Sequence, residues 1–217
     1  MSNAQVWKVR YVEDSKVDPK VWEEIPPLVI DNFPWDENGY RPRTEVRIFY
    51  SETRFYLLFK AFEQEIRAEC LNINDPVCTD SCVEFFFNPD PEHDDRYINF
   101  EINPIGTFLL GIGADRYSRV LINDVSPEIF DITTSVTKDS VQSYKDPLWT
   151  AEYSIPFYFI EKYYGRQDFR CGKRIKANFY KCGDKTKYPH WGCWNRIDTP
   201  HPDFHRPEFF GDLILGC

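Results

Sequence analysis

The chain has 217 residues, of which 42% are hydrophobic and 17% aromatic, so it can bury a core and is not a disordered polymer. Its formal net charge of −9 at pH 7 argues against a nucleic-acid partner, because phosphate binding needs a basic surface. No apolar run approaches the roughly 20 residues that span a bilayer, so we expect no membrane helix.

The first half of the chain is punctuated by Pro, Asn and Asp between short apolar runs. Residues 5–35 carry Trp7, Trp22 and Trp35 among prolines that include Pro26, Pro27 and Pro34, and we expect this segment to form an extended N-terminal wrap over one side of the domain. Residues 45–50 and 55–62 are rich in β-branched and aromatic side chains and flank a short polar turn, which predicts a β-hairpin. A third strand is predicted at 82–87.

Residues 97–103 alternate with a period of two, which is the pattern of a strand with two different faces. Ile98, Phe100 and Ile102 share the apolar face, while Glu101 and Asn103 lie on the polar face. The strand 107–112 follows, and its glycines at 111 and 113 predict a bulge or close packing.

The remaining strands are predicted at 132–136, 148–155, 175–180 and 213–215. Only residues 157–164 have a helical pattern, and that helix is short. Many short strands separated by turn signals predict an all-β fold rather than alternating βαβ units. We therefore expect a single domain over residues 1–217, an antiparallel β-sandwich of jelly-roll or immunoglobulin-like type with at most one short helix.

The polar face of 97–103 is the first candidate site. The interpretation without a function is that this face of the strand is simply exposed to solvent, as alternation usually implies. Glu84, a lone acid on the apolar run 82–87, favours a binding surface instead, because a carboxylate there needs a partner. Two acids, Glu84 and Glu101, also allow a glycoside hydrolase, whose chemistry uses a carboxyl pair.

Metal binding has two weaker candidates. Cys193, His201 and His205 match no structural zinc spacing and lack a paired CxxC motif. The acidic turn 90–95 can offer oxygen ligands to calcium, although it lacks the order of an EF-hand and also suits a solvated turn.

The segment 191–211 packs aromatic, guanidinium and imidazole groups into a run interrupted by prolines, so it predicts a rigid loop rather than a helix or a central strand. Rings held on such a loop can present a flat amphipathic docking surface, although most of these rings also suit a core.

An ordered set of short motifs resembles the family 9 carbohydrate-binding modules from about residue 22 to residue 215. The motifs are Val46-Arg-Ile-Phe-Tyr, Phe55-Tyr-Leu-Leu-Phe, Asp80-Ser-Cys-Val-Glu84-Phe, Phe100-Glu-Ile-Asn103, Trp149-Thr-Ala-Glu152-(x2)-Ile-Pro156, Asn178-Phe-Tyr180, Trp194 and Pro207-Glu-Phe-Phe-Gly211. The resemblance implies an antiparallel β-sandwich without catalytic activity that binds sugar ends in a slot between two tryptophans.

The chain departs from that family at the slot. Cys78 and Phe204 stand where the two clamping tryptophans are expected, Glu101 replaces an arginine and Tyr180 replaces an amide, whereas Glu84 and Asn103 match. Tyr180, Trp191 or Trp194 can supply a substitute ring. The residues predicted to contact the sugar are Glu84, Glu101, Asn103, Tyr180, Trp194, Phe204 and Arg206.

The resemblance therefore implies a non-catalytic domain that recognises a carbohydrate, related to xylan or another glycan, with no certain cofactor. The alternative is an interaction or accessory domain that kept the fold and lost the sugar site. The seven cysteines are an odd number without the density of a disulfide scaffold, so we expect most to be reduced and the protein to be cytoplasmic, unless a signal peptide has been removed from the sequence.

Overall fold

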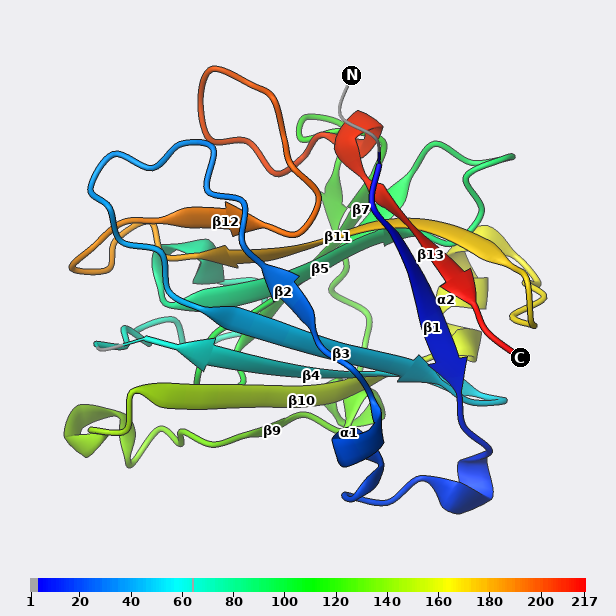
Figure 1. Cartoon of the computed structure of the whole chain (residues 1–217), viewed down its shortest axis with the longest axis horizontal. Helices are drawn as coiled ribbons and strands as arrows, with labels where there is room; N and C mark the ends of the chain where they lie inside the picture. The colour runs from blue at the N-terminus through cyan, green and yellow to red at the C-terminus, as the bar shows by residue number, and fades with distance from the viewer. Residues whose placement is uncertain (1–3, 64) are drawn as a thin grey trace.

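The computed structural model describes residues 4–63 and 65–217 and shows two β-sheets packed face to face (Figure 1). The first sheet holds β5 (Cys82–Asn88), β6 (Tyr97–Ile102), β7 (Phe108–Gly113), β8 (Val120–Leu121), β11 (Arg174–Cys182), β12 (Trp191–Cys193) and β13 (Gly211–Leu215). The second holds β2 (Leu28–Ile30), β3 (Thr44–Tyr50), β4 (Arg54–Phe62), β9 (Thr133–Thr134) and β10 (Leu148–Pro156). The β-sandwich predicted from the sequence is confirmed.

The strand β1 (Val6–Tyr11) connects the two sheets. Its first half pairs in parallel with β13, from Val6 opposite Asp212, and its end pairs in parallel with β3, where Tyr11 lies opposite Tyr50. The other strand pairs are antiparallel among the described residues. The expected N-terminal wrap is therefore wrong in part, because β1 is integrated into the sheets. Local periodicity gave no sign of this pairing, which depends on partners more than 30 residues away.

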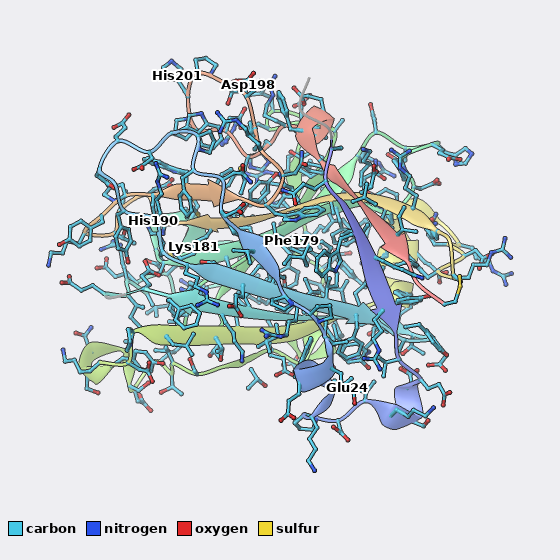
Figure 2. The ribbon with its side chains drawn as sticks, in the orientation of Figure 1. Glu24, Phe179, Lys181, His190, Asp198 and His201 are labelled. Atoms are coloured by element: carbon cyan, nitrogen blue, oxygen red, sulfur yellow. A yellow bond between two sulfur atoms is a disulfide. The ribbon has the colours of Figure 1, made fainter. Side chains whose placement is uncertain are left out.

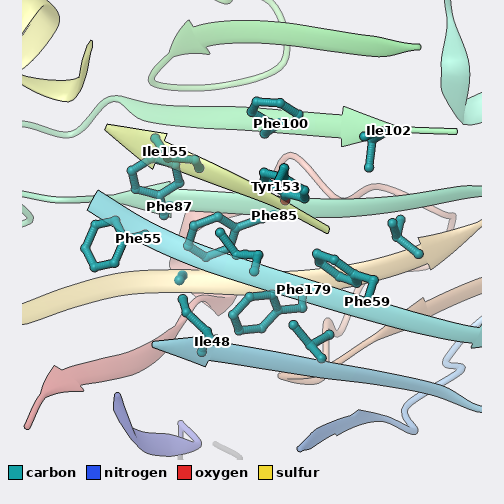
Figure 3. Close-up of a cluster of buried hydrophobic side chains, with 14 of the residues drawn as sticks. Ile48, Phe55, Phe59, Phe85, Phe87, Phe100, Ile102, Tyr153, Ile155 and Phe179 are labelled. Atoms are coloured by element: carbon teal, nitrogen blue, oxygen red, sulfur yellow. The ribbon is translucent and has the colours of Figure 1, made fainter. Parts of the chain in front are cut away.

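Side chains point alternately to the two faces of each strand, and those of one face fill the space between the two sheets (Figure 3). Phe85 and Phe87 from β5 and Phe100 from β6 meet Phe59 from β4 and Tyr153 from β10 in one buried cluster. Phe100 and Tyr153 stack at 4.6 Å across the two sheets. The side chains that alternate with these point to the opposite, outer face of the first sheet.

The predicted strands agree with the observed ones to within a few residues, and the hairpin between β3 and β4 pairs Tyr50 with Phe55. The predicted helix is α2 (Phe157–Tyr164), which packs Phe157 and Ile160 against the core. A one-turn helix, α1 (Val21–Glu24), is additional to the prediction. Across the described residues, the structure contains no helix long and apolar enough to cross a membrane.

The cysteines divide into one disulfide and five free thiols. Cys171, in the loop before β11, is bonded to Cys217 at the C-terminus. Cys70, Cys78, Cys82, Cys182 and Cys193 are free.

This division predicts a thiol count. In denaturant, where burial no longer protects them, we expect five thiols per chain to react with Ellman's reagent before reduction and all seven cysteines after it. Mass spectrometry of an alkylated tryptic digest should assign the single bridge to Cys171 and Cys217. Three bridges, or none, would contradict this assignment.

Candidate functional site

A pocket of about 370 Å³ opens on the outer face of the first sheet. Its floor comes from β5, β6, β7 and β11, and its walls come from four loops that lie far apart in the sequence. The loop residues are Pro76, Cys78, Arg116, Arg119, Asp184, Pro202, Asp203, Phe204 and His205, together with Trp191 of β12. The polar face of 97–103 is thus covered by loops and buried, so the alternative interpretation of a solvent-facing strand side is wrong.

Glu84 and Glu101 lie side by side on the pocket floor. They are direct partners in the antiparallel pairing of β5 with β6, which places both side chains on the same face. Both are almost fully buried, with 2% and 4% of their surface exposed. Two carboxyl groups in such a position cannot both carry a charge without a compensating partner.

Burial is the main cause of a raised pKa at both acids. It raises the pKa of Glu101 to about 7, although the guanidinium of Arg119, 3.3 Å from its Oε1, and an amide hydrogen bond from Asn99 act in the opposite direction. The pKa of Glu84 is raised well above its ordinary value by burial and by the neighbouring Glu101. The shift favours the neutral carboxyl form of Glu84, which can donate a hydrogen bond as well as accept one.

A chain of hydrogen bonds runs from the acids to the loop 202–205. Arg119 Nη1 donates to His205 Nε2 at 3.1 Å, so the proton of this imidazole is on Nδ1, which faces the Tyr97 hydroxyl at 2.7 Å. Burial and the nearby arginines lower the pKa of His205 to about 2, which keeps the ring neutral. The network fixes the position of Arg119 beside Glu101.

The two glycines at 111 and 113 explain how Arg119 reaches the pocket. A Cβ at Gly111 would lie 2.9 Å from Arg119 Cδ, and one at Gly113 would lie 2.5 Å from Arg119 Cα. Only glycine leaves room for the backbone and side chain of Arg119 against β7. The expected close packing at these glycines is confirmed, and it was the one sequence signal that pointed toward Arg119, which the sequence analysis did not select.

Aromatic rings form one side of the pocket. Phe204 stacks on Tyr180 with ring centroids 4.1 Å apart, and the Tyr180 hydroxyl donates to the Phe204 carbonyl. Trp191 is partly exposed at the pocket, and its indole donates to Asp184 at 2.8 Å. Tyr180 is fully buried and supports Phe204, so Trp191 and Phe204 are the rings that face the pocket.

Three residues selected from the sequence lie elsewhere. Asn103 is fully buried, donates to Asp80 and the Cys70 carbonyl, and accepts from two backbone amides, so its side chain holds loops together. Trp194 packs in the core against Phe179. Arg206 lies outside the pocket and pairs with Glu208 at 2.6 Å. The orientation of loop residues follows from contacts that alternation does not encode.

The residues considered from the sequence as metal ligands do not come together in the structure. His201 is exposed on the loop at the top of Figure 2, whereas His205 bonds to Tyr97 and Cys193 bonds to the Asn32 carbonyl, so the three do not meet. Within residues 4–63 and 65–217, ligand atoms of three metal-binding side chains come together in one group, Cys82, Glu84 and Cys182.

The acidic turn 90–95 has carboxylates that are already paired. Asp90 bonds to His93 at 2.8 Å and Asp94 bonds to Arg96 at 2.6 Å. Calcium binding at this turn stays a prediction.

The pocket combines donors and acceptors with an aromatic wall. Arg116 and Arg119 can only donate, Asp184 and Asp203 can only accept when ionised, and a protonated Glu84 does both. Concave sites of this size with few convergent polar groups are typical of small-molecule binding. A polar ligand with many hydroxyls and one apolar face matches these features.

The model of carbohydrate-binding family 9 matches residues 18–215. No curated protein matches the chain. Among solved structures, a protein from Bacteroides uniformis ATCC 8492, provisionally assigned as carbohydrate-binding, is 29% identical; the match covers 98% of this chain and 99% of that one, with a TM-score of 0.82.

Two further solved structures are of a family 9 carbohydrate-binding module from Caldicellulosiruptor kristjanssonii, each 12% identical. The one with glucose covers 98% of this chain and 97% of that one at a TM-score of 0.65. The one with cellotriose covers 98% and 94% at 0.63. At this identity the likeness shows a shared fold.

Proposed function

This chain belongs to carbohydrate-binding family 9, and from that premise we propose that it binds the end of a sugar chain in the pocket over Glu84 and Glu101. Modules of the family are non-catalytic, so the chain is a carbohydrate-binding domain and not an enzyme. The two acids then serve as hydrogen-bonding groups rather than as a catalytic pair.

One observation carries the proposal: the buried carboxyl group of Glu101, the guanidinium of Arg119 and the partly exposed indole of Trp191 line the same pocket. A sugar hydroxyl both donates and accepts, so it can bridge Glu101 and Arg119, which are held 3.3 Å apart. The apolar face of a pyranose can rest on Trp191, whose indole N–H is already bonded to Asp184. Trp191 thereby takes over the stacking role for which the family uses tryptophans at the positions of Cys78 and Phe204.

The ligands to test first are glucose and cellotriose, because solved structures of the same family contain them. We expect isothermal titration calorimetry to detect binding of one of these or of a related oligosaccharide, and Trp191→Ala to weaken it at least ~30-fold. An aromatic anchor is worth about 2 kcal/mol, and each 1.4 kcal/mol is tenfold in affinity.

The matched control is Tyr158→Ala, which removes an exposed ring on α2 outside the pocket and should leave the affinity unchanged. Equal losses in both variants, or sugar binding that survives the loss of Trp191, would exclude the pocket as the binding site. A glycan array extends the test to xylan and other glycans.

A second candidate function is an interaction domain that has lost sugar binding. It is favoured by Cys78 and Phe204, which replace both expected tryptophans, and by the tight stacking of Phe204 on Tyr180. Absence of binding across a glycan array, together with capture of a protein partner that Trp191→Ala or Phe204→Ala abolishes, would favour this candidate.

A further inference from the structure

Three buried side chains come together beneath the proposed sugar pocket. The proposed function gives no role to this cluster as a whole. Cys82 and Cys182 are direct partners in the antiparallel pairing of β5 with β11, and Glu84 follows Cys82 by two residues on the same face. Cys182 Sγ lies 3.0 Å from Glu84 Oε1, and Cys82 Sγ lies 3.9 Å from the same oxygen. The three ligand atoms all lie within 4.8 Å of one another.

We propose that Cys82, Cys182 and Glu84 form a binding site for a thiophilic divalent cation such as Zn²⁺. Two thiolate sulfurs and one carboxylate oxygen are a ligand set that Zn²⁺ accepts, with bond lengths of about 2.3 Å to sulfur and about 2.0–2.2 Å to oxygen. A cation at those distances holds its ligand atoms roughly 3.5–4 Å apart, which fits within the observed spacing. This inference goes beyond the sugar-binding proposal and does not depend on it.

The site has an entry path and an open coordination position. Cys182 and Glu84 line the pocket of about 370 Å³, so an ion can reach them from solvent without unfolding of the sheet. Three protein ligands leave the fourth tetrahedral position to water from the pocket. Cys78 lines the same pocket.

Zn²⁺ binds thiolates rather than thiols, so an ion that enters the site must displace the protons of Cys82 and Cys182. Binding therefore releases protons and weakens as the pH falls.

Cadmium titration of the full chain tests the site directly. In protein whose five free thiols have first been counted, we expect about one equivalent of Cd²⁺ to produce a thiolate-to-metal charge-transfer absorption in the ultraviolet. Zn²⁺ alone should bind in calorimetry with release of protons and should suppress the Cd²⁺ signal. Cys182→Ser should lose the absorption and about 100-fold or more of the affinity, since even outer groups of metal sites contribute 10–100-fold.

Cys193→Ser is the matched control, because this thiol is also free and buried but bonds to the Asn32 carbonyl away from the cluster. It should keep the full absorption. Cys82→Ser provides a second variant, and far-UV circular dichroism confirms that each variant is folded. The proposal is overturned if the wild type shows no absorption, or if Cys182→Ser and Cys82→Ser both retain it.

Discussion

Lys181→Met is expected to lower the free energy of unfolding by about 3–5 kcal/mol, because it leaves a buried carboxylate without its cation. Lys181 Nζ lies 3.0 Å from Glu63 Oε2, and the two side chains are 0% and 1% exposed. The same ammonium donates to the Cys182 carbonyl and to His190 Nε2, so all three of its N–H groups have partners. Figure 2 labels Lys181, which lies in β11, and His190 next to each other.

Urea denaturation followed by tryptophan fluorescence measures this effect. Lys187→Met is the matched control, because Lys187 forms an ion pair with Glu65 in which both side chains are 55% exposed. Such exposed pairs contribute at most about 1 kcal/mol. Similar small losses in both variants would show that the buried pair is not stabilising. A double variant with Glu63→Leu should regain part of the loss, since no uncompensated charge remains.

Glu84→Gln is expected to raise the free energy of unfolding at pH 7 and to change it little at pH 4, because the amide does not titrate. The pKa of an unperturbed glutamic acid is about 4.3. Burial and the neighbouring Glu101 raise the pKa of Glu84 well above its ordinary value in the folded protein. Between these two values the folded chain holds a proton that the unfolded chain has released, so wild-type stability falls as the pH rises. Each unit of this difference costs about 1.4 kcal/mol, and a neutral amide removes the cost.

The comparison needs urea denaturation at both pH values. Glu92→Gln serves as control, because Glu92 is exposed in the turn after β5 and should stay within about 0.5 kcal/mol of wild type at both. A destabilised Glu84→Gln at pH 7, or an equal change at both pH values, would contradict the raised pKa. If the variant also loses sugar binding, Glu84 is retained for function at the expense of stability.

The sequence alone determined that the fold is a β-sandwich and which side chains lie on each face of its strands. Alternation along 97–103 separated Phe100 from Glu101, and the helix at 157–164 was found at its observed bounds. Both inferences rest on periodicity within one segment, which local geometry imposes on any strand or helix. Because Glu84 lies in an apolar run, the sequence also indicated correctly that its carboxyl group needs a partner within the fold.

Tertiary structure alone decided which residues meet in the pocket. The pairing of Glu84 with Glu101 depends on register, and a shift of one residue would have moved one of them to the core face. Arg119 and Trp191 reach the same pocket, whereas Trp194 turns into the core. These outcomes are set by contacts between residues far apart in the chain, such as Arg119 with His205, and no local pattern records them.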